Sequence, residues 1–376
     1  MTKKICNVCG NLLFKKSIVE FKNAPDSAQN FNLKKKIKSN IKLKISQCSG
    51  CGLVQVTNKP VNYYKSVIRA VGVSQSMLKF RKKQFSQFKN KFNLKNKSAI
   101  EIGCGSGDYL TILKKIIKKS YGIEGSDKNY QLCKKKKLNV FKGFINSPNY
   151  KISNKKFDAF FIFSYLEHIP NINKFVRGVY NNLTENAVGI VEVPNFDMII
   201  KKKLYTEFII DHLYYFTKQT LRLLLENNGF EIFESSEIWN KYILSVTVRK
   251  KKLLKMNDFN YSTKIIKSKI TKFIHRYPSK KVAVWGAGHQ ALTLITLTGV
   301  YNNIKYIVDS AKFKQNKFAP GCNLKIVSPD IFKKDKIAAI IVMAAGFSDE
   351  VCATIRSFNN KISIVKLENN NLIKIA

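Results

Sequence analysis

The chain has 376 residues, of which 45% are hydrophobic, and a formal net charge of +43. This length allows two or three domains with cores of their own, and the hydrophobic content is ordinary for a folded protein. Its uncharged apolar stretches are too short to cross a bilayer, and no apolar segment follows the first lysines. We therefore expect a cytoplasmic protein with reduced cysteines and no membrane partner.

The positive charge raises the question of nucleic-acid binding. Only seven of the 67 basic residues are arginine, the side chain that best forks onto phosphates and guanine edges. The lysines are scattered through every segment, which is typical of solvated faces. We therefore do not expect nucleic acid as a partner.

Residues 1–57 carry four cysteines in two pairs, Cys6 with Cys9 and Cys48 with Cys51. Each pair has two residues between its members and is followed by glycine, which lets backbone amides turn toward a thiolate. Four thiolates at this spacing suit tetrahedral zinc and leave no open position for water. The pattern predicts a structural zinc module.

Beyond the cysteines, residues 58–97 have helical periodicity and should form a helical cap or linker. Residues 98–250 alternate strand-like and helix-like patches, which is typical of an α/β domain with a doubly wound parallel sheet. Strands are expected at 98–102, 120–124, 157–164 and 187–193. Residues 251–376 form a lysine-rich helical connector and a smaller Rossmann-like domain, with strands expected at 281–285, 304–309 and 338–343.

A glycine-rich loop follows the first strand of the central domain and precedes a helix, where a cofactor loop belongs. Nicotinamide enzymes share such a loop, but two acids favour S-adenosylmethionine. Glu101 ends the strand, near the place of the cofactor's amino acid part, and Glu124 ends the next strand roughly 20 residues on, suited to ribose hydroxyls. The predicted cofactor-binding residues are Glu101, Gly103, Cys104, Gly105, Gly107, Glu124, Gly125 and Ser164.

The chain resembles the three-part sugar C-methyltransferases of deoxysugar biosynthesis. Those enzymes have an N-terminal four-cysteine zinc domain, a central S-adenosylmethionine domain and a C-terminal Rossmann-like domain. The resemblance covers nearly the whole chain, and the order of the motifs carries it. The matching stretches include 6–51, Tyr63-Tyr64, 101–107, Leu166-Glu167-His168-Ile169-Pro170, Val191-Glu192-Val193-Pro194-Asn195, Asp211-His212-Leu213 and Trp285-Gly286-Ala287-Gly288.

This resemblance implies a nucleotide-linked 4-keto sugar as substrate. In the family a histidine removes the proton beside the keto group, and the enolate attacks the methyl sulfonium. The family's catalytic stretch reads Tyr-His-Glu-His, whereas here the same place reads Ile209-Ile210-Asp211-His212. The resemblance thus implies catalytic roles for His212, His168 and Asp211, and substrate-binding roles for Tyr63, Tyr64 and Asn195.

Two other functions are compatible with the sequence. An O-methyltransferase on the same scaffold needs a base but no keto group. A nucleic-acid-binding zinc protein with a degenerate methyltransferase domain is opposed by the intact acids and glycines of the cofactor loop.

A second glycine loop, 286–291, mimics a dinucleotide fingerprint together with Asp309. The resemblance implies instead a non-redox domain that helps to enclose the nucleotide sugar, so we expect no bound NAD.

Overall fold

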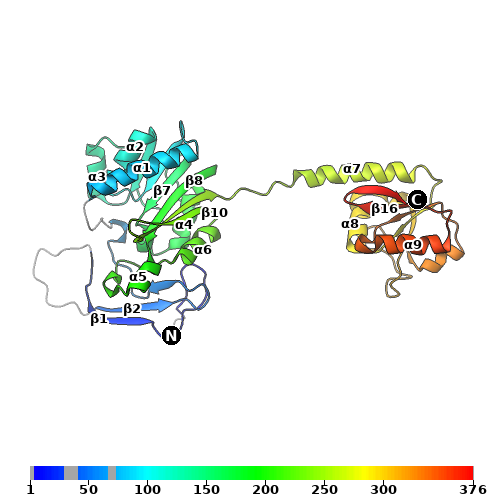
Figure 1. The fold of residues 1–376 in the computed structure, drawn as a ribbon, viewed down its shortest axis with the longest axis horizontal. Coiled ribbons are helices and arrows are strands. Elements are labelled where there is room, and N and C mark those ends of the chain that lie inside the picture. The colour runs from blue at the N-terminus through cyan, green and yellow to red at the C-terminus, as the bar shows by residue number, and fades with distance from the viewer. Residues whose placement is uncertain (1–3, 29–40, 67–72, 376) are drawn as a thin grey trace, which may run out of the picture. The chain divides into compact units, whose positions relative to one another are not determined.

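The computed structural model describes residues 4–28, 41–66 and 73–375. The chain divides into two compact units, Met1–Lys252 and Leu253–Ala376 (Figure 1). The cysteine-bearing segment is part of the first unit rather than a unit of its own.

The centre of the first unit is a sheet whose described strands have the order β10-β11-β8-β7-β4-β5-β6. Neighbours from β6 to β8 are parallel, but β11 is antiparallel to β8 and to β10. The α/β fold with a mainly parallel sheet is as predicted, and its edge is antiparallel because the short link after β10 makes a hairpin. The strands are β4 Ser98–Ile102, β5 Lys119–Glu124, β6 Val140–Lys142, β7 Phe157–Phe163, β8 Leu183–Pro194, β10 Phe230–Ile238 and β11 Ile243–Lys250.

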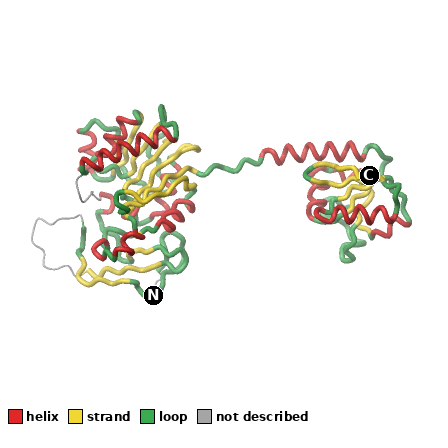
Figure 2. The backbone as a smooth tube through the Cα atoms, in the orientation of Figure 1, coloured by secondary structure: helices red, strands yellow, loops and turns green. Residues whose placement is uncertain are grey.

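Helices cover both faces of this sheet (Figure 2). Alternate residues of β7 point to opposite faces, so Phe161 packs with α1, α2 and α3, and Ile162 packs with α4 and α6. The four strands predicted at 98–102, 120–124, 157–164 and 187–193 are confirmed to within a few residues. The helices are α1 Gln75–Lys91, α2 Asp108–Ile116, α3 Asp127–Lys135, α4 Ile172–Asn181, α5 Phe196–Lys202 and α6 Lys218–Asn227.

A second sheet joins the cysteine-bearing segment to the central α/β domain. Its described strands are β1 Val19–Ala24, β2 Ile41–Gln47, β3 Val54–Val56 and β9 Tyr214–Tyr215, in that order and antiparallel. Strand β9 comes from the central domain, and its Tyr215 pairs with Val54. This pairing fixes the N-terminal segment against the residues that directly follow His212.

The second unit begins with the helix α7 Asn257–Ile274 and contains a sheet of described strands in the order β14-β13-β12-β15-β16-β17. The strands predicted at 281–285, 304–309 and 338–343 are confirmed. None of the described helices in either unit is long and apolar enough to cross a membrane. The remaining elements are β12 Val282–Trp285, α8 His289–Thr298, β13 Ile304–Val308, β14 Ile326–Val327, β15 Ala339–Val342, α9 Ser348–Phe358, β16 Ser363–Glu368 and β17 Asn371–Ile375.

A buried ion pair holds α1 against the central sheet. The guanidinium of Arg81 lies 2.5 Å from the carboxylate of Glu192 on β8, and both side chains are almost fully buried. Gln84 and Ser245 donate hydrogen bonds of 2.6 and 3.0 Å to the same carboxylate. Removing one partner of such a pair leaves the other charge buried and uncompensated.

We expect Arg81→Ala to lower the free energy of unfolding by about 3–5 kcal/mol, because Glu192 would lose its counter-charge in the core. Arg222→Ala is the matched control, since its ion pair with Glu226 is exposed, and it should cost at most about 1 kcal/mol. Urea unfolding of both variants measures the difference. Equal losses would show that the buried pair has no special part in stability.

Candidate active site and cysteine cluster

The glycine loop after β4 has the backbone shape that a close ligand contact requires. Gly103 and Gly105 have positive φ angles of 71° and 54°. A Cβ atom on Gly103 would lie 2.8 Å from the ring of Tyr165, whereas one on Gly105 would meet nothing within 4 Å. Gly103 thus packs the loop against Tyr165, and Gly105 leaves open space for a ligand to approach.

Glu124, at the end of β5, is held against this loop. Its two carboxylate oxygens accept hydrogen bonds of 2.8 Å from the backbone amides of Gly105 and Ser126. Burial raises the pKa of Glu124, and these amides oppose the rise. Glu101 is buried on the neighbouring strand β4. Both acids therefore lie where parallel strands end, the edge at which α/β sheets bind ligands.

The other residues predicted to bind the cofactor, Cys104, Gly125 and Ser164, differ in burial and in the space around them. The thiol of Cys104 is buried and points toward Gly122, on which a Cβ would lie 2.6 Å from its sulfur, so only its backbone belongs to the loop. Gly125 has no room for a Cβ, which would lie 2.4 Å from the carbonyl oxygen of Lys65. Ser164 is exposed at the end of β7 with a positive φ of 47°.

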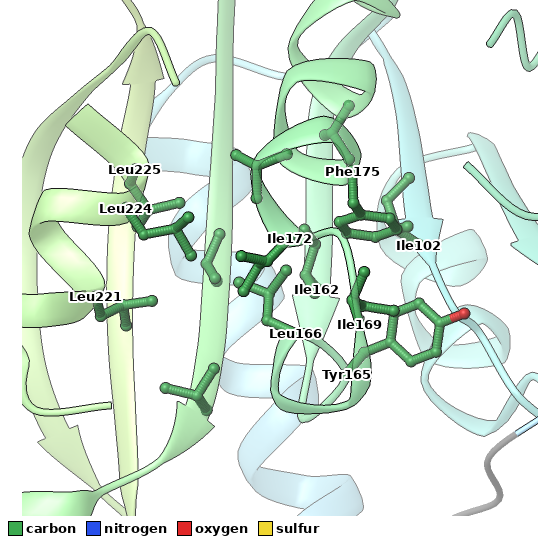
Figure 3. Packing of buried hydrophobic residues seen from close by; sticks show 14 of the residues in the cluster. Ile102, Ile162, Tyr165, Leu166, Ile169, Ile172, Phe175, Leu221, Leu224 and Leu225 are labelled. Carbon is green, nitrogen blue, oxygen red and sulfur yellow. The ribbon is translucent and has the colours of Figure 1, made fainter. Parts of the chain in front are cut away.

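The short helix η2, Leu166–His168, carries the next polar groups and directly follows Tyr165. Figure 3 shows that Leu166 points into the apolar cluster beside Ile162 and Ile172. Apolar anchoring of this kind fixes the turn, so that Glu167 and His168 are held at the same edge of the sheet as the cofactor loop.

His168 and His212 lie side by side although they are far apart in the sequence. The residue before His212, Asp211, is 43 positions after His168 and forms a hydrogen bond with it. The Nδ1 atom of His168 lies 2.9 Å from the backbone oxygen of Asp211, so this nitrogen donates and Nε2 keeps its lone pair. The two imidazole rings lie edge to face, with centroids 4.9 Å apart. Burial lowers the pKa of His168 to about 4. Burial, and secondarily His168, hold the pKa of His212 well below its ordinary value.

The carboxylate of Asp211 is buried and has structural partners. It accepts a hydrogen bond of 2.6 Å from the hydroxyl of Tyr63 and one of 2.9 Å from the backbone amide of Ala28. Tyr64 packs its ring edge-on against Phe144. Asp211 and Tyr63 thus fasten the segment that contains His212 to the short helix η1, Tyr64–Ser66, which lies next to Gly125.

Glu167 is a functional candidate that the sequence reasoning did not single out. It is almost fully buried, and its Oε2 atom has no hydrogen-bond partner among the described residues. A carboxyl oxygen of Glu167, a ring nitrogen of His168 and a ring nitrogen of His212 all lie within 4.8 Å of one another. Burial raises the pKa of Glu167 to about 8. Its position beside His168 in the sequence was the available signal, but only the fold brings His212 to it.

The four cysteines come together in the first unit. The sulfurs of Cys6 and Cys51 are 3.7 Å apart, and those of Cys9 and Cys48 are 3.4 Å apart. These separations approach the edge of a tetrahedron with metal–sulfur bonds of about 2.3 Å. Backbone amides of Val8, Gly50 and Cys51 point at these sulfurs. The donor set and its geometry fit zinc.

In the second unit, Asp309 lies at the end of β13 beside the second glycine loop. Its carboxylate accepts hydrogen bonds of 2.8 Å from the amides of Ala287 and Ala311 and pairs with Lys314 at 2.9 Å. These contacts outweigh burial and lower the pKa of Asp309. The carboxylate braces the loop in this structure.

Comparisons with known proteins match two parts of the chain. Residues 77–235 match the family model described as a methyltransferase domain, and residues 247–365 match that of a C-methyltransferase C-terminal domain. The ubiquinone biosynthesis O-methyltransferase of Pelagibacter ubique is 24% identical over 188 residues, which are 46% of this chain and 77% of that protein.

Solved structures with a similar part include two methyltransferases. An S-adenosylmethionine-dependent methyltransferase from Clostridium acetobutylicum is 16% identical, with a TM-score of 0.40 over 50% of this chain and 96% of that one. The magnesium protoporphyrin IX methyltransferase of Synechocystis, solved with bound S-adenosylhomocysteine, is 15% identical, with a TM-score of 0.38 over 48% of this chain and 90% of that one.

The strand order, the glycine loop with its acids and the matched methyltransferase domain define a class of enzyme. The chain is an S-adenosylmethionine-dependent methyltransferase with a Rossmann-like α/β fold. The second matched region, residues 247–365, is similar to the C-terminal domain of C-methyltransferases.

Asn195 has a structural place that the sequence did not reveal. It is fully buried at the start of α5, where its side-chain oxygen accepts from the amide of Met198. Its side-chain nitrogen donates to Glu237 at 3.1 Å and to the carbonyl of Lys241 at 2.8 Å. Both polar atoms are used within the protein, so we leave Asn195 out of the proposed site.

We expect Asn195→Ala to lower the free energy of unfolding by about 1–2 kcal/mol, because α5 loses its cap. Affinity for S-adenosylmethionine should stay unchanged. Thermal unfolding and calorimetry measure the two quantities. A stable variant with a raised KM for the acceptor would return Asn195 to the substrate site.

Proposed function

We propose that this enzyme methylates a carbon atom of a nucleotide-linked keto sugar, with His212 as the base. The observation that carries the proposal is the pair of imidazoles of His168, which is buried, and His212, which is half-buried, whose ring centroids are 4.9 Å apart. His168 lies three residues after Tyr165, whose ring packs against Gly103 of the cofactor loop. The match of residues 247–365 to a C-methyltransferase C-terminal domain supports C-methylation.

The cofactor site is proposed from the loop and the two buried acids. When bound, S-adenosylmethionine supplies an electrophilic methyl group on a positively charged sulfur. Glu124, already beside the amide of Gly105, has free lone pairs for ribose hydroxyls. Glu101 would attract the amino group of the methionine part, and Gly105 gives the space for close backbone approach.

The chemical step needs a base and an acidic carbon. A carbonyl on the neighbouring carbon acidifies the acceptor C–H bond, and a His212 nitrogen takes that proton. The electron pair of the C–H bond then forms the new bond to the methyl carbon, and the electrons of the broken sulfur–methyl bond stay on sulfur. Because its low pKa leaves His212 uncharged at neutral pH, the imidazole is in the form that accepts a proton.

The surrounding residues position this base. His168 donates to the carbonyl of Asp211, the residue that directly precedes His212. Tyr63 and Ala28 hold the Asp211 carboxylate, so Asp211 supports the site rather than offering a free carboxylate. Tyr63 and Tyr64, at the start of η1, are proposed to line the substrate side of the site.

O-methylation is the second candidate. The curated relative of 24% identity is an O-methyltransferase of ubiquinone biosynthesis. A hydroxyl acceptor needs a base but no adjacent carbonyl, so His212 would have the same role. A nucleotide sugar with a free hydroxyl and no keto group is the probe that separates this candidate from the first.

We also propose that the four cysteines hold one structural zinc ion. Analysis of freshly purified protein should find one equivalent of zinc per chain, and Cys48→Ser should lose it and unfold at lower temperature. Structural zinc can contribute about 10–16 kcal/mol to local folding. Cys352→Ser is the control, because this buried cysteine lies in the second unit. Zinc well below one equivalent in the wild type would contradict the proposal.

His212→Asn should lower kcat by about 10²–10⁴-fold, because general-base catalysis typically contributes that much. Affinity for S-adenosylmethionine should remain nearly the same. A screen of nucleotide sugars, with detection of methylated product and S-adenosylhomocysteine, supplies the assay. His275→Asn is the matched control, since His275 is exposed in the second unit.

The pH profile gives a second readout of the same role. The depressed pKa of His212 means that the imidazole stays unprotonated below its ordinary value of about 6.5. The rate should therefore hold as pH falls through that value and drop only at lower pH. Near wild-type turnover of His212→Asn on an accepted substrate would make His212 a structural residue.

A further inference from the structure

Two polar groups of the candidate site, the side chains of Glu167 and His212, lie close together and have polar atoms without partners among the described residues. The Oε2 atom of Glu167 is buried and has no hydrogen-bond partner among the described residues. The imidazole of His212 likewise makes no hydrogen bond to a described side chain or backbone group; only its backbone amide does so, to Ile209. Leaving a buried polar group unpaired costs free energy, so the unpaired oxygen of Glu167 beside the half-buried imidazole of His212 calls for a functional reason.

The backbone already holds these two residues together. The amide of Leu213, directly after His212, donates a hydrogen bond of 2.7 Å to the carbonyl of Glu167. One carboxyl oxygen of Glu167 and one imidazole nitrogen of His212 lie within 4.8 Å of each other, and so does a nitrogen of His168. Catalytic hydrogen bonds are often long before substrate binds and shorten in the complex.

His168 determines which roles the three groups can take. Because its Nδ1 donates to the Asp211 carbonyl, its Nε2 can only accept. A carboxyl group that is protonated has one hydroxyl that donates and one oxygen that accepts. It can therefore donate to His168 and accept from an N–H of His212 at the same time.

We propose that Glu167 is a positioning residue that bridges His168 and His212 as a protonated carboxyl group. Its hydroxyl donates to Nε2 of His168, and its other oxygen accepts the N–H of His212. The bridge fixes His212 in the tautomer whose second nitrogen has a free lone pair for the substrate. Its catalytic consequence rests on the proposed function of His212, but the bridge itself does not.

The protonation states agree with this arrangement. Burial raises the pKa of Glu167 to about 8 and lowers that of His168 to about 4, so near neutral pH the acid keeps its proton and the imidazole does not. The other ionisable groups near the bridge are Asp211, Tyr215, whose ring lies 6.2 Å from that of His212, and Tyr242. Asp211 is already paired with Tyr63.

The test compares two substitutions at Glu167 by nitrogen NMR of the histidines. Glu167→Gln keeps one donor and one acceptor of the same shape, so it should preserve the bridge. Glu167→Leu removes both. The chain has only four histidines, and loss of signals in His212→Asn assigns the ring of interest. Bound S-adenosylmethionine at unchanged affinity verifies that each variant is folded.

We expect His212 to show one tautomer in the wild type and in Glu167→Gln, and a tautomer mixture in Glu167→Leu. On an accepted substrate, kcat of Glu167→Leu should fall about 10²-fold with KM little changed, and that of Glu167→Gln should stay within a few-fold. Glu207→Leu, which alters a nearby acid that bonds Tyr242, should behave as the wild type. Should Glu167→Leu fail to fold, Glu167→Met takes its place.

An unchanged tautomer in Glu167→Leu would overturn the bridge. The bridge would also be overturned if Glu167→Gln lost as much activity as Glu167→Leu. That result would mean that the site needs an ionised carboxylate rather than a protonated carboxyl group. A second equivalent of added zinc or manganese that binds the wild type, but not Glu167→Gln or His212→Asn, would replace the bridge with a metal site. If Glu167→Leu showed a tautomer mixture at His212 but an unchanged kcat, the bridge would stand and His212 would not be the base.

Discussion

The hydrogen bond between the imidazole of His168 and the backbone carbonyl of Asp211 joins the two parts of the chain on which the site depends. One part is the turn after β7, which packs against the cofactor loop through Tyr165 and Gly103. The other is the segment that carries His212, from which β9 continues into the N-terminal sheet. Because the acceptor is a backbone atom, the bond fixes the path of the chain as well as the ring of His168.

The cysteine cluster is coupled to the same segment by short connections. The turn that contains Cys48 and Cys51 leads directly into β3, whose Val56 amide donates 3.0 Å to the carbonyl of Leu213. Asn7, between Cys6 and Cys9, donates 3.0 Å to the hydroxyl of Tyr214. The cysteine cluster is therefore connected to the segment of His212 through only a few residues.

Local signals in the sequence were sufficient for much of the fold. The strand before Gly103, the glycine loop and the apolar run from Phe157 were predictable because their periodicity and turn residues act over a few positions. No strand was predicted at β10 or β11, and the pattern of these segments does not determine the direction in which they pair. The use of Asn195 as a helix cap could not be predicted from the motif, because a motif does not distinguish a ligand-binding amide from a capping one.

The contacts within the site could not be predicted in the same way. Tyr63 and Asp211 are far apart in the chain, as are His168 and Asp211, and only tertiary packing brings them together. Glu167 stood beside a predicted catalytic residue, but its meaning depends on burial, which a single sequence does not give. The apolar pair Ile209 and Ile210 has a structural explanation in part, since Ile210 is buried in the cluster formed with the N-terminal sheet.

The central proposal is that His212, positioned by its neighbours, removes a proton from a carbon of a keto sugar. That carbon then accepts the methyl group. The most direct measurement uses S-adenosylmethionine labelled with ¹³C in its methyl group, a nucleotide-linked 4-keto sugar and NMR of the product. The account predicts a labelled methyl with a one-bond coupling to a sugar carbon next to the carbonyl. A labelled methyl attached to oxygen, with no carbon–carbon coupling, would contradict it.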